Sequence, residues 1–104
     1  MTVLTVRYEA RPEHVDDVVA GIERAFAAVE REQPAGIRYA LGRLPDGVTF
    51  VGLLELADGV DNPLPGIAAA GELQQRLAGW VVGAPPIPQP LHVVGDHRLF
   101  GPRG

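Results

Sequence analysis

The chain has 104 residues, a net charge of −4 and a pI near 5.2, so it is expected to form a single domain, residues 1–104, without the basic surface that sequence-independent nucleic-acid binding requires. All nine basic residues are Arg and Cys is absent, which excludes lysine Schiff bases, thiolate nucleophiles, disulfides and Cys-ligated metal centres. No apolar run reaches the ~18 residues of a membrane span and no basic signal-peptide segment opens the chain, so we expect a soluble, cytoplasmic protein that binds no membrane.

The first third of the chain predicts a strand followed by an amphipathic helix. Residues 3–9 alternate between polar and apolar side chains, and Tyr8 on the apolar face is expected to line the interior. Pro12 suits the first turn of a helix, where its missing N–H is tolerated. Apolar residues then recur at helical spacing over 15–29, and Pro34 ends the helix.

Residues 37–56 predict a β-hairpin around the turn Pro45-Asp46-Gly47. One face of the second arm carries Val48, Phe50, Leu54 and Leu56, and the other carries Thr49, Val51, Leu53 and Glu55. A strand that is apolar on both faces is covered on both faces. The chain's own helices can cover one face, and in a chain of this length the other requires a second copy. The pattern therefore predicts a homodimer.

The last half of the chain predicts a helix and a final strand. Turn residues occupy 57–65, a second apolar stripe indicates a helix from about 65 to 82, and the proline-rich stretch 83–90 is expected to be an extended connector. Residues 91–100 alternate like a strand. The order β-α-β-β-α-β predicts an α+β, ferredoxin-like split βαβ fold with an antiparallel sheet.

These elements and several short stretches resemble the antibiotic biosynthesis monooxygenase superfamily of dimeric α+β barrels. The matching stretches are 36–39, 61–65, 77–80 and 93–100. The resemblance implies two sheets facing each other across a homodimer, with a pocket between each sheet and its helices. Members include cofactor-free oxygenases of phenols and quinols, and haem-degrading enzymes. The haem-degrading branch fits poorly, because its Asn on the first strand and its His after a helical Trp have no counterpart in this sequence.

Five side chains are candidates for a site in such a pocket. Trp80 is either a core residue or a wall against which a flat aromatic molecule stacks. Tyr39 and Arg38 are strand neighbours that must point to opposite faces, so only one can enter the pocket as a hydrogen-bond donor. His97 is either a buried structural residue or a general base on the apolar face of the last strand. Asn62 is either a turn residue or an oxyanion donor.

The three histidines predict no metal site. His92 and His97 lie on opposite faces of the last predicted strand, and His14 lies in the first turn of a helix. Because dinucleotide and phosphate-loop fingerprints are also absent, no cofactor is expected.

The sequence leaves two functions open. The first is a cofactor-independent monooxygenase of the quinol or phenol type, acting on a small hydrophobic aromatic molecule, with His97 as base, Tyr39 or Arg38 orienting the substrate, and Trp80 and Asn62 binding it. The alternative is a non-catalytic dimeric module of the same fold that binds a small ligand or has a structural role.

Overall fold

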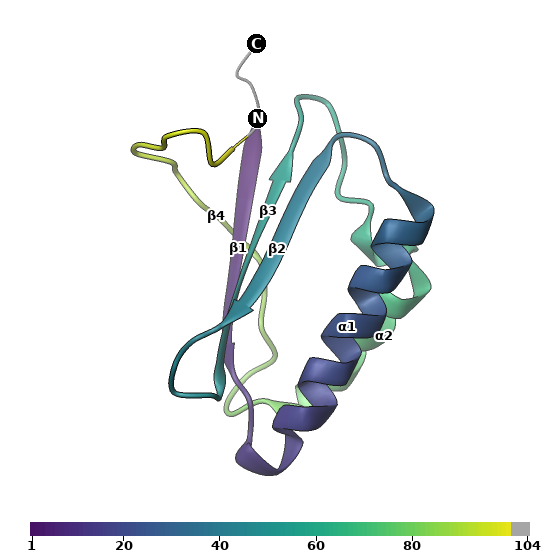
Figure 1. Ribbon diagram of the computed structural model, residues 1–104, viewed down its shortest axis with the longest axis vertical. Coiled ribbons are helices and arrows are strands. Elements are labelled where there is room, and N and C mark those ends of the chain that lie inside the picture. Colours follow the sequence, from purple (N-terminus) through teal and green to yellow (C-terminus); the bar gives the residue numbers. More distant parts are fainter. Residues whose placement is uncertain (101–104) are drawn as a thin grey trace.

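The computed structural model describes residues 1–100, and it shows a four-stranded antiparallel sheet with two helices on one face (Figure 1). In chain order the elements are β1 (Thr2–Glu9), the 3₁₀ turn η1 (Pro12–His14), α1 (Val15–Glu32), β2 (Ile37–Arg43), β3 (Thr49–Leu56), the 3₁₀ turn η2 (Leu64–Gly66), α2 (Ala68–Trp80) and β4 (Gln89–Pro90). The α+β ferredoxin-like fold predicted from the sequence is confirmed.

The strand order is β2-β3-β1-β4, so β3 lies inside the sheet as the double-sided pattern predicts. β1 pairs with β3 along its whole length, which places Leu4 opposite Leu54 and Tyr8 opposite Phe50. Because side chains alternate across a strand, these four residues share the face that the helices cover. This face forms one wall of the interior.

The hairpin between β2 and β3 is closed by Asp46. Its carboxylate accepts hydrogen bonds from the backbone N–H groups of Val48 and Thr49, both at 2.9 Å, and from the Thr49 hydroxyl at 2.6 Å. These bonds, the one from the Thr49 hydroxyl first, lower the pKa of Asp46. Gly47 adopts a φ of +80°, which glycine accepts without strain. The predicted turn is confirmed.

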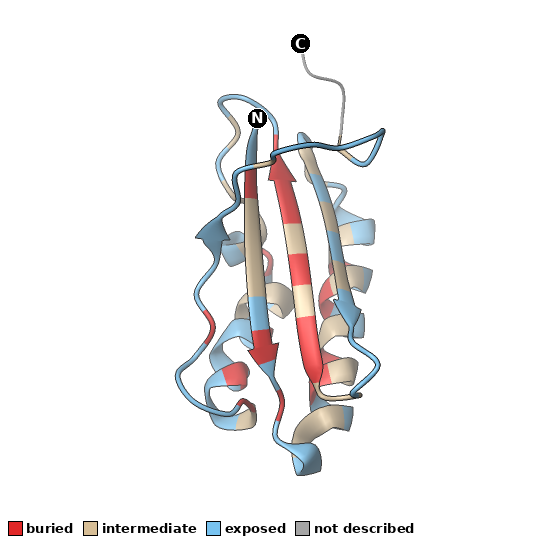
Figure 2. Ribbon diagram, turned by 90° about the vertical axis from the view of Figure 1, so that its left-hand side faces the viewer, coloured by how far each residue is buried: buried red, intermediate tan, exposed pale blue. Residues whose placement is uncertain are grey.

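The core lies between the sheet and the two helices. Phe50, Val18 and Val81 are its largest fully buried side chains, and they come from β3, α1 and the residue after α2. Gly21 allows α1 to approach α2 closely, because a Cβ at this position would lie 2.9 Å from the Leu73 side chain. Figure 2 shows burial concentrated along β3, in the middle of the sheet.

The C-terminal region differs from the sequence-based expectation. Residues 91–100 form no strand, and the fourth strand is the pair Gln89–Pro90 within the stretch expected to be a connector; it pairs with Leu4 and Thr5. Alternation identifies a segment that can form a strand, but a strand also needs a neighbour. Beyond the bond from Leu91 N–H to the Val3 carbonyl, no ladder continues in the described residues.

The face of the sheet opposite the helices is only partly covered. Val51 and Leu53 are half-buried there, and Ala40 is exposed. Beyond β4 the chain crosses this outer face at the end where β1 begins, on the side of the sheet away from both helices (Figures 1 and 2). The chain's own helices therefore cover one face of β3, as expected, and leave the middle of the other accessible.

Among the described residues, no helix combines the length and hydropathy needed to cross a membrane.

Candidate functional site

A pocket of about 450 Å³ lies between the sheet and α2. Its apolar lining from the strands and helices includes Leu4, Val6, Leu41, Leu54, Leu73 and Leu77. Its polar lining residues are Thr5, Tyr8, Tyr39, Asn62, Gln74 and Gln75. All of these polar groups are uncharged near neutral pH, and no Asp, Glu, His or Arg is among the lining residues of the described chain.

Two glycines contribute to the space. Gly52 lies between Phe50 and Leu54 on the helix-facing side of β3. Side chains alternate along a strand, so these three positions all face the interior. A Cβ at Gly52 would lie 3.0 Å from Val6 Cγ1, so a side chain here would occupy the floor of the pocket. Gly71 on α2 lines the opposite wall. A lone Gly inside an apolar strand was the sequence signal for this close approach.

Tyr8 is the most deeply buried polar side chain of the pocket. Its ring stacks on that of Phe50 with a centroid distance of 5.6 Å and an interplanar angle of 18°. The residue is 7% exposed, and its hydroxyl has no hydrogen-bond partner in the part of the chain that the structure describes. An unsatisfied buried hydroxyl costs about 1–3 kcal/mol.

Burial, and secondarily the nearby Tyr39, raises the pKa of Tyr8 well above its usual value. Tyr8 is therefore a neutral phenol at physiological pH, able to donate its proton to an acceptor but unable to serve as a phenolate base. The sequence predicted that Tyr8 lines the interior without identifying this unsatisfied donor. In the sequence, the signal for this donor was a tyrosine on a strand face whose other residues are aliphatic.

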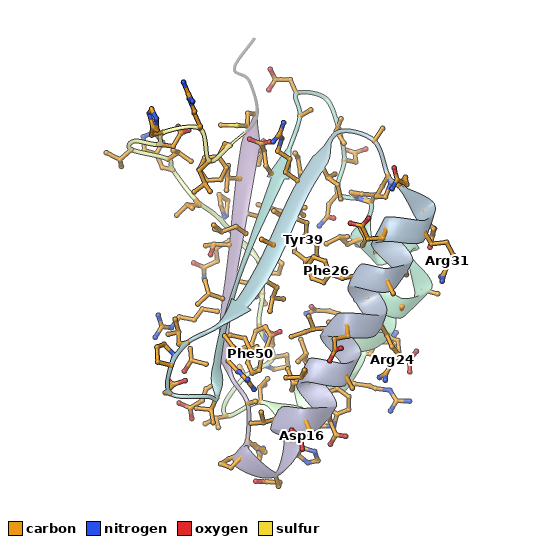
Figure 3. The ribbon with its side chains drawn as sticks, viewed as in Figure 1. Asp16, Arg24, Phe26, Arg31, Tyr39 and Phe50 are labelled. Atoms are coloured by element: carbon orange, nitrogen blue, oxygen red, sulfur yellow. The ribbon has the colours of Figure 1, made fainter. Side chains whose placement is uncertain are left out.

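Tyr39, and not Arg38, enters the space between the sheet and the helices. Its ring stacks on Phe26 of α1 with centroids 4.6 Å apart and planes 14° apart (Figure 3). Burial raises the pKa of Tyr39, so this phenol is also protonated at neutral pH. Arg38 lies on the outer face, where its Nε is 3.4 Å from a carboxylate oxygen of Glu55. The alternative left open by the sequence is thereby decided in favour of Tyr39.

Asn62 is a turn residue that also lines the pocket, and its role as an oxyanion donor stays a prediction. Its side-chain oxygen accepts a hydrogen bond from Leu64 N–H at 3.0 Å, which stabilises the turn before η2. The same side chain lines the pocket. On an adjacent wall, Gln74 Nε2 donates a hydrogen bond to the Pro86 carbonyl at 2.9 Å. This bond ties the proline-rich segment to α2 beside the pocket.

Trp80 and His97 do not line the pocket. Trp80 packs against the core at the end of α2, and its ring stacks on His14 with centroids 6.2 Å apart. His97 is exposed, so the expectation that it lies on a buried strand face is wrong, because residues 91–100 have no strand partner in the single chain. A base role for His97 remains a prediction, and it requires this segment to move or a second chain to supply it.

The described residues contain no group of three or more His, Cys, Asp or Glu side chains placed to hold a metal ion. What the pocket provides is an apolar space, two neutral phenols and carboxamide groups. Such a set can bind and orient a molecule and can stabilise a partial negative charge by donation.

Neither a protein-family model nor a curated protein matches the sequence. Among solved structures, the crystal structure of an antibiotic biosynthesis monooxygenase superposes with a TM-score of 0.68 over 91% of this chain and 100% of its own, at 14% sequence identity. The chain shares the antibiotic biosynthesis monooxygenase fold. A protein of unknown function from Nitrosomonas europaea superposes with a TM-score of 0.69 at 19% identity, over 96% of this chain and 95% of its own. At these identities the likeness concerns the fold.

Proposed function

We propose that this protein binds a small, hydrophobic, aromatic molecule in the pocket between its sheet and α2. The observation that carries the proposal is an apolar cavity of about 450 Å³ with a few polar groups converging on it. This volume falls within the roughly 300–1,000 Å³ typical of small-molecule sites, and the mixture of aliphatic lining and sparse donors is also typical of them.

The shape of the lining favours a flat ligand. Leu41 and Leu54 line the pocket from the sheet, and Leu73 and Leu77 line it from α2, so both layers supply aliphatic walls. A planar ring between such walls removes apolar surface from water on both of its faces, which is the main favourable contribution to binding at an uncharged site.

A second candidate function is oxygenation of the bound aromatic molecule, and the name of the structural neighbour is the specific observation in its favour. In the cofactor-free reaction a phenol and O₂ give a quinone and water: one oxygen atom enters the ring, the other leaves as water, and the ring loses four electrons. The phenols of Tyr8 and Tyr39 would stabilise negative charge on the ring oxygen. Because no base lines the pocket in the described residues, the substrate would enter as the neutral phenol and lose its proton to His97 of another chain.

We further propose that the protein acts as a homodimer in which a second copy covers the outer face of the sheet. The half-buried Val51 and Leu53 on that face support this proposal, as do the exposed apolar side chains of the segment beyond β4, among them Val94 at 94% exposure and Leu99 at 67%. A stable interface of this type would bury roughly 2,000 Å² or more in total.

Two measurements on the purified protein test the function. Isothermal titration calorimetry with naphthalene derivatives should detect binding, and a complete absence of heat would contradict the binding proposal. An oxygen electrode with a panel of dihydroxynaphthalenes then separates the two candidates. Oxygen uptake that falls roughly 10²-fold in His97→Ala would support catalysis with His97 as base. Ligand binding without oxygen uptake would identify the protein as a ligand-binding module. Oxygen uptake that is the same in His97→Ala as in the wild type would exclude His97 as the base.

A further inference from the structure

The pocket carries information about its ligand beyond shape, and this inference rests on the binding function proposed above. We infer that the ligand is an uncharged molecule whose carbonyl-type oxygen accepts a hydrogen bond from the hydroxyl of Tyr8, with Tyr39 as a second donor.

The lining excludes a charged ligand. An ion brought into an apolar site needs a partner of opposite charge, or several strong hydrogen bonds, to replace its water. No Arg, Asp, Glu or His lines the pocket in the described part of the chain, and the sequence has no Lys. A carboxylate or an ammonium group would therefore lose its hydration without compensation, whereas a ketone, ester or quinone oxygen loses much less.

Tyr8 supplies the specific donor. Its side chain is more than nine-tenths buried, lines the pocket, and has a hydroxyl without a partner among the described residues. The hydroxyl is buried, so donation to a ligand requires the side chains around it to move. Burial keeps this phenol protonated, as its raised pKa indicates. An incoming acceptor oxygen satisfies a donor that the fold alone leaves unpaired.

The two phenols flank the same strand. Tyr8 on β1 pairs with Phe50 and Tyr39 on β2 pairs with Leu54, so both project to the helix side of the sheet with β3 between them. Gly52 lies between Phe50 and Leu54 on that side of β3 and adds no side chain. Tyr8 and Tyr39 therefore approach the pocket from opposite sides of β3.

Three naphthalenes of nearly equal shape test the inference by calorimetric titration of the full chain. They are 2-acetylnaphthalene, which is neutral and has an acceptor oxygen; 2-isopropenylnaphthalene, which lacks the oxygen; and 2-naphthoate, which is an anion. We expect the ketone to bind roughly five- to tenfold more tightly than the hydrocarbon, which is the scale of one hydrogen bond, and the anion to bind most weakly. Tyr8→Phe should abolish the preference for the ketone while leaving the affinity for the hydrocarbon intact.

Two controls accompany this titration. Tyr39→Phe should reduce the preference for the ketone in part, and Thr2→Val, which removes an exposed hydroxyl at the start of β1, should not change it. Equal affinities for ketone and hydrocarbon in the wild type, a preference that survives Tyr8→Phe, or tighter binding of the anion would each overturn the inference while leaving the binding function intact. Failure of all three compounds to bind would overturn both. The wild-type comparison decides the matter even if Tyr8→Phe does not fold.

Discussion

Tyr8 on β1 lies directly opposite Phe50 on β3, and the two rings stack with their centroids 5.6 Å apart. This contact fixes the Tyr8 ring in the core and holds its hydroxyl where no described protein group accepts its proton. A buried donor without a hydrogen-bond partner lowers the stability of the fold and needs an explanation. In the binding proposal, the ligand supplies the missing acceptor. The stacked pair therefore connects the stability of the fold to the selectivity of the pocket.

Tyr8→Phe is expected to stabilise the unliganded protein. The substitution removes the unsatisfied hydroxyl and keeps the ring that stacks on Phe50, so the free energy of unfolding should rise by about 1 kcal/mol. Urea denaturation followed by far-UV circular dichroism measures this change, with Thr2→Val as the control for loss of an exposed hydroxyl. A decrease in stability would show that the hydroxyl has a partner in the folded chain.

Gly52→Ala is expected to weaken ligand binding more than it changes stability. The new methyl group would lie 3.0 Å from Val6 and would occupy the floor of the pocket, so the affinity for 2-acetylnaphthalene should fall by roughly tenfold or more. Gly42→Ala is the matched control, because a Cβ at Gly42 on the adjacent strand meets no atom within 4 Å. Comparable losses in the two variants would indicate that the effect is on the sheet and not on the pocket.

Stability is expected to fall at alkaline pH because of the two tyrosines. Burial raises the pKa of Tyr8, and of Tyr39, above the usual value of 10.0. Above pH 10 the unfolded chain loses these protons while the folded chain retains them. A raised folded pKa therefore contributes stability that is complete below pH 10 and is lost as pH rises further, by up to about 1.4 kcal/mol per pH unit for each tyrosine.

This dependence can be measured by urea denaturation between pH 8 and pH 11. Tyr8→Phe should make the loss of stability shallower above pH 10 and leave the curve unchanged in slope below pH 9. Absorbance at 295 nm provides an independent measure, since the chain has only two tyrosines and both should ionise together with unfolding. Free titration of both phenols at pH 10 in the folded protein would contradict the buried placement.

The two faces of β3 are expected to respond differently to a charge. Leu54 is 4% exposed and faces the helices, so Leu54→Asp places a carboxylate in the core and should unfold the chain. Leu53 lies on the outer face and is half-buried in the single chain, so Leu53→Asp should mainly disrupt the proposed homodimer.

Light scattering on the wild type should give twice the chain mass of 11.1 kDa at micromolar concentration. A monomeric wild type would contradict the homodimer. A folded, dimeric Leu53→Asp would show that the second copy binds elsewhere.

The sequence by itself determined the first three strands, the two helices and their order. Helical spacing over 15–29, the Pro45-Asp46-Gly47 turn and a β3 apolar on both faces are local patterns, and each corresponds to a feature that the structure contains. Local geometry is enough for such features, because periodicity and turn chemistry act between residues that are close in the chain. The same patterns were sufficient to reach the ferredoxin-like fold.

Only the tertiary structure decided which side chains share the pocket. Whether Tyr39 or Arg38 faces the helices depends on how β2 pairs with β3, and a shift of one residue would exchange them. His97 lies on an alternating segment that looks like a strand, but in the single chain that segment has no neighbour to pair with, and the residue is exposed. Trp80 lies on the apolar stripe of α2 but is directed to the core beside His14. The unpaired hydroxyl of Tyr8 depends on the positions of every group around it, and those positions are set by packing between elements distant in the chain.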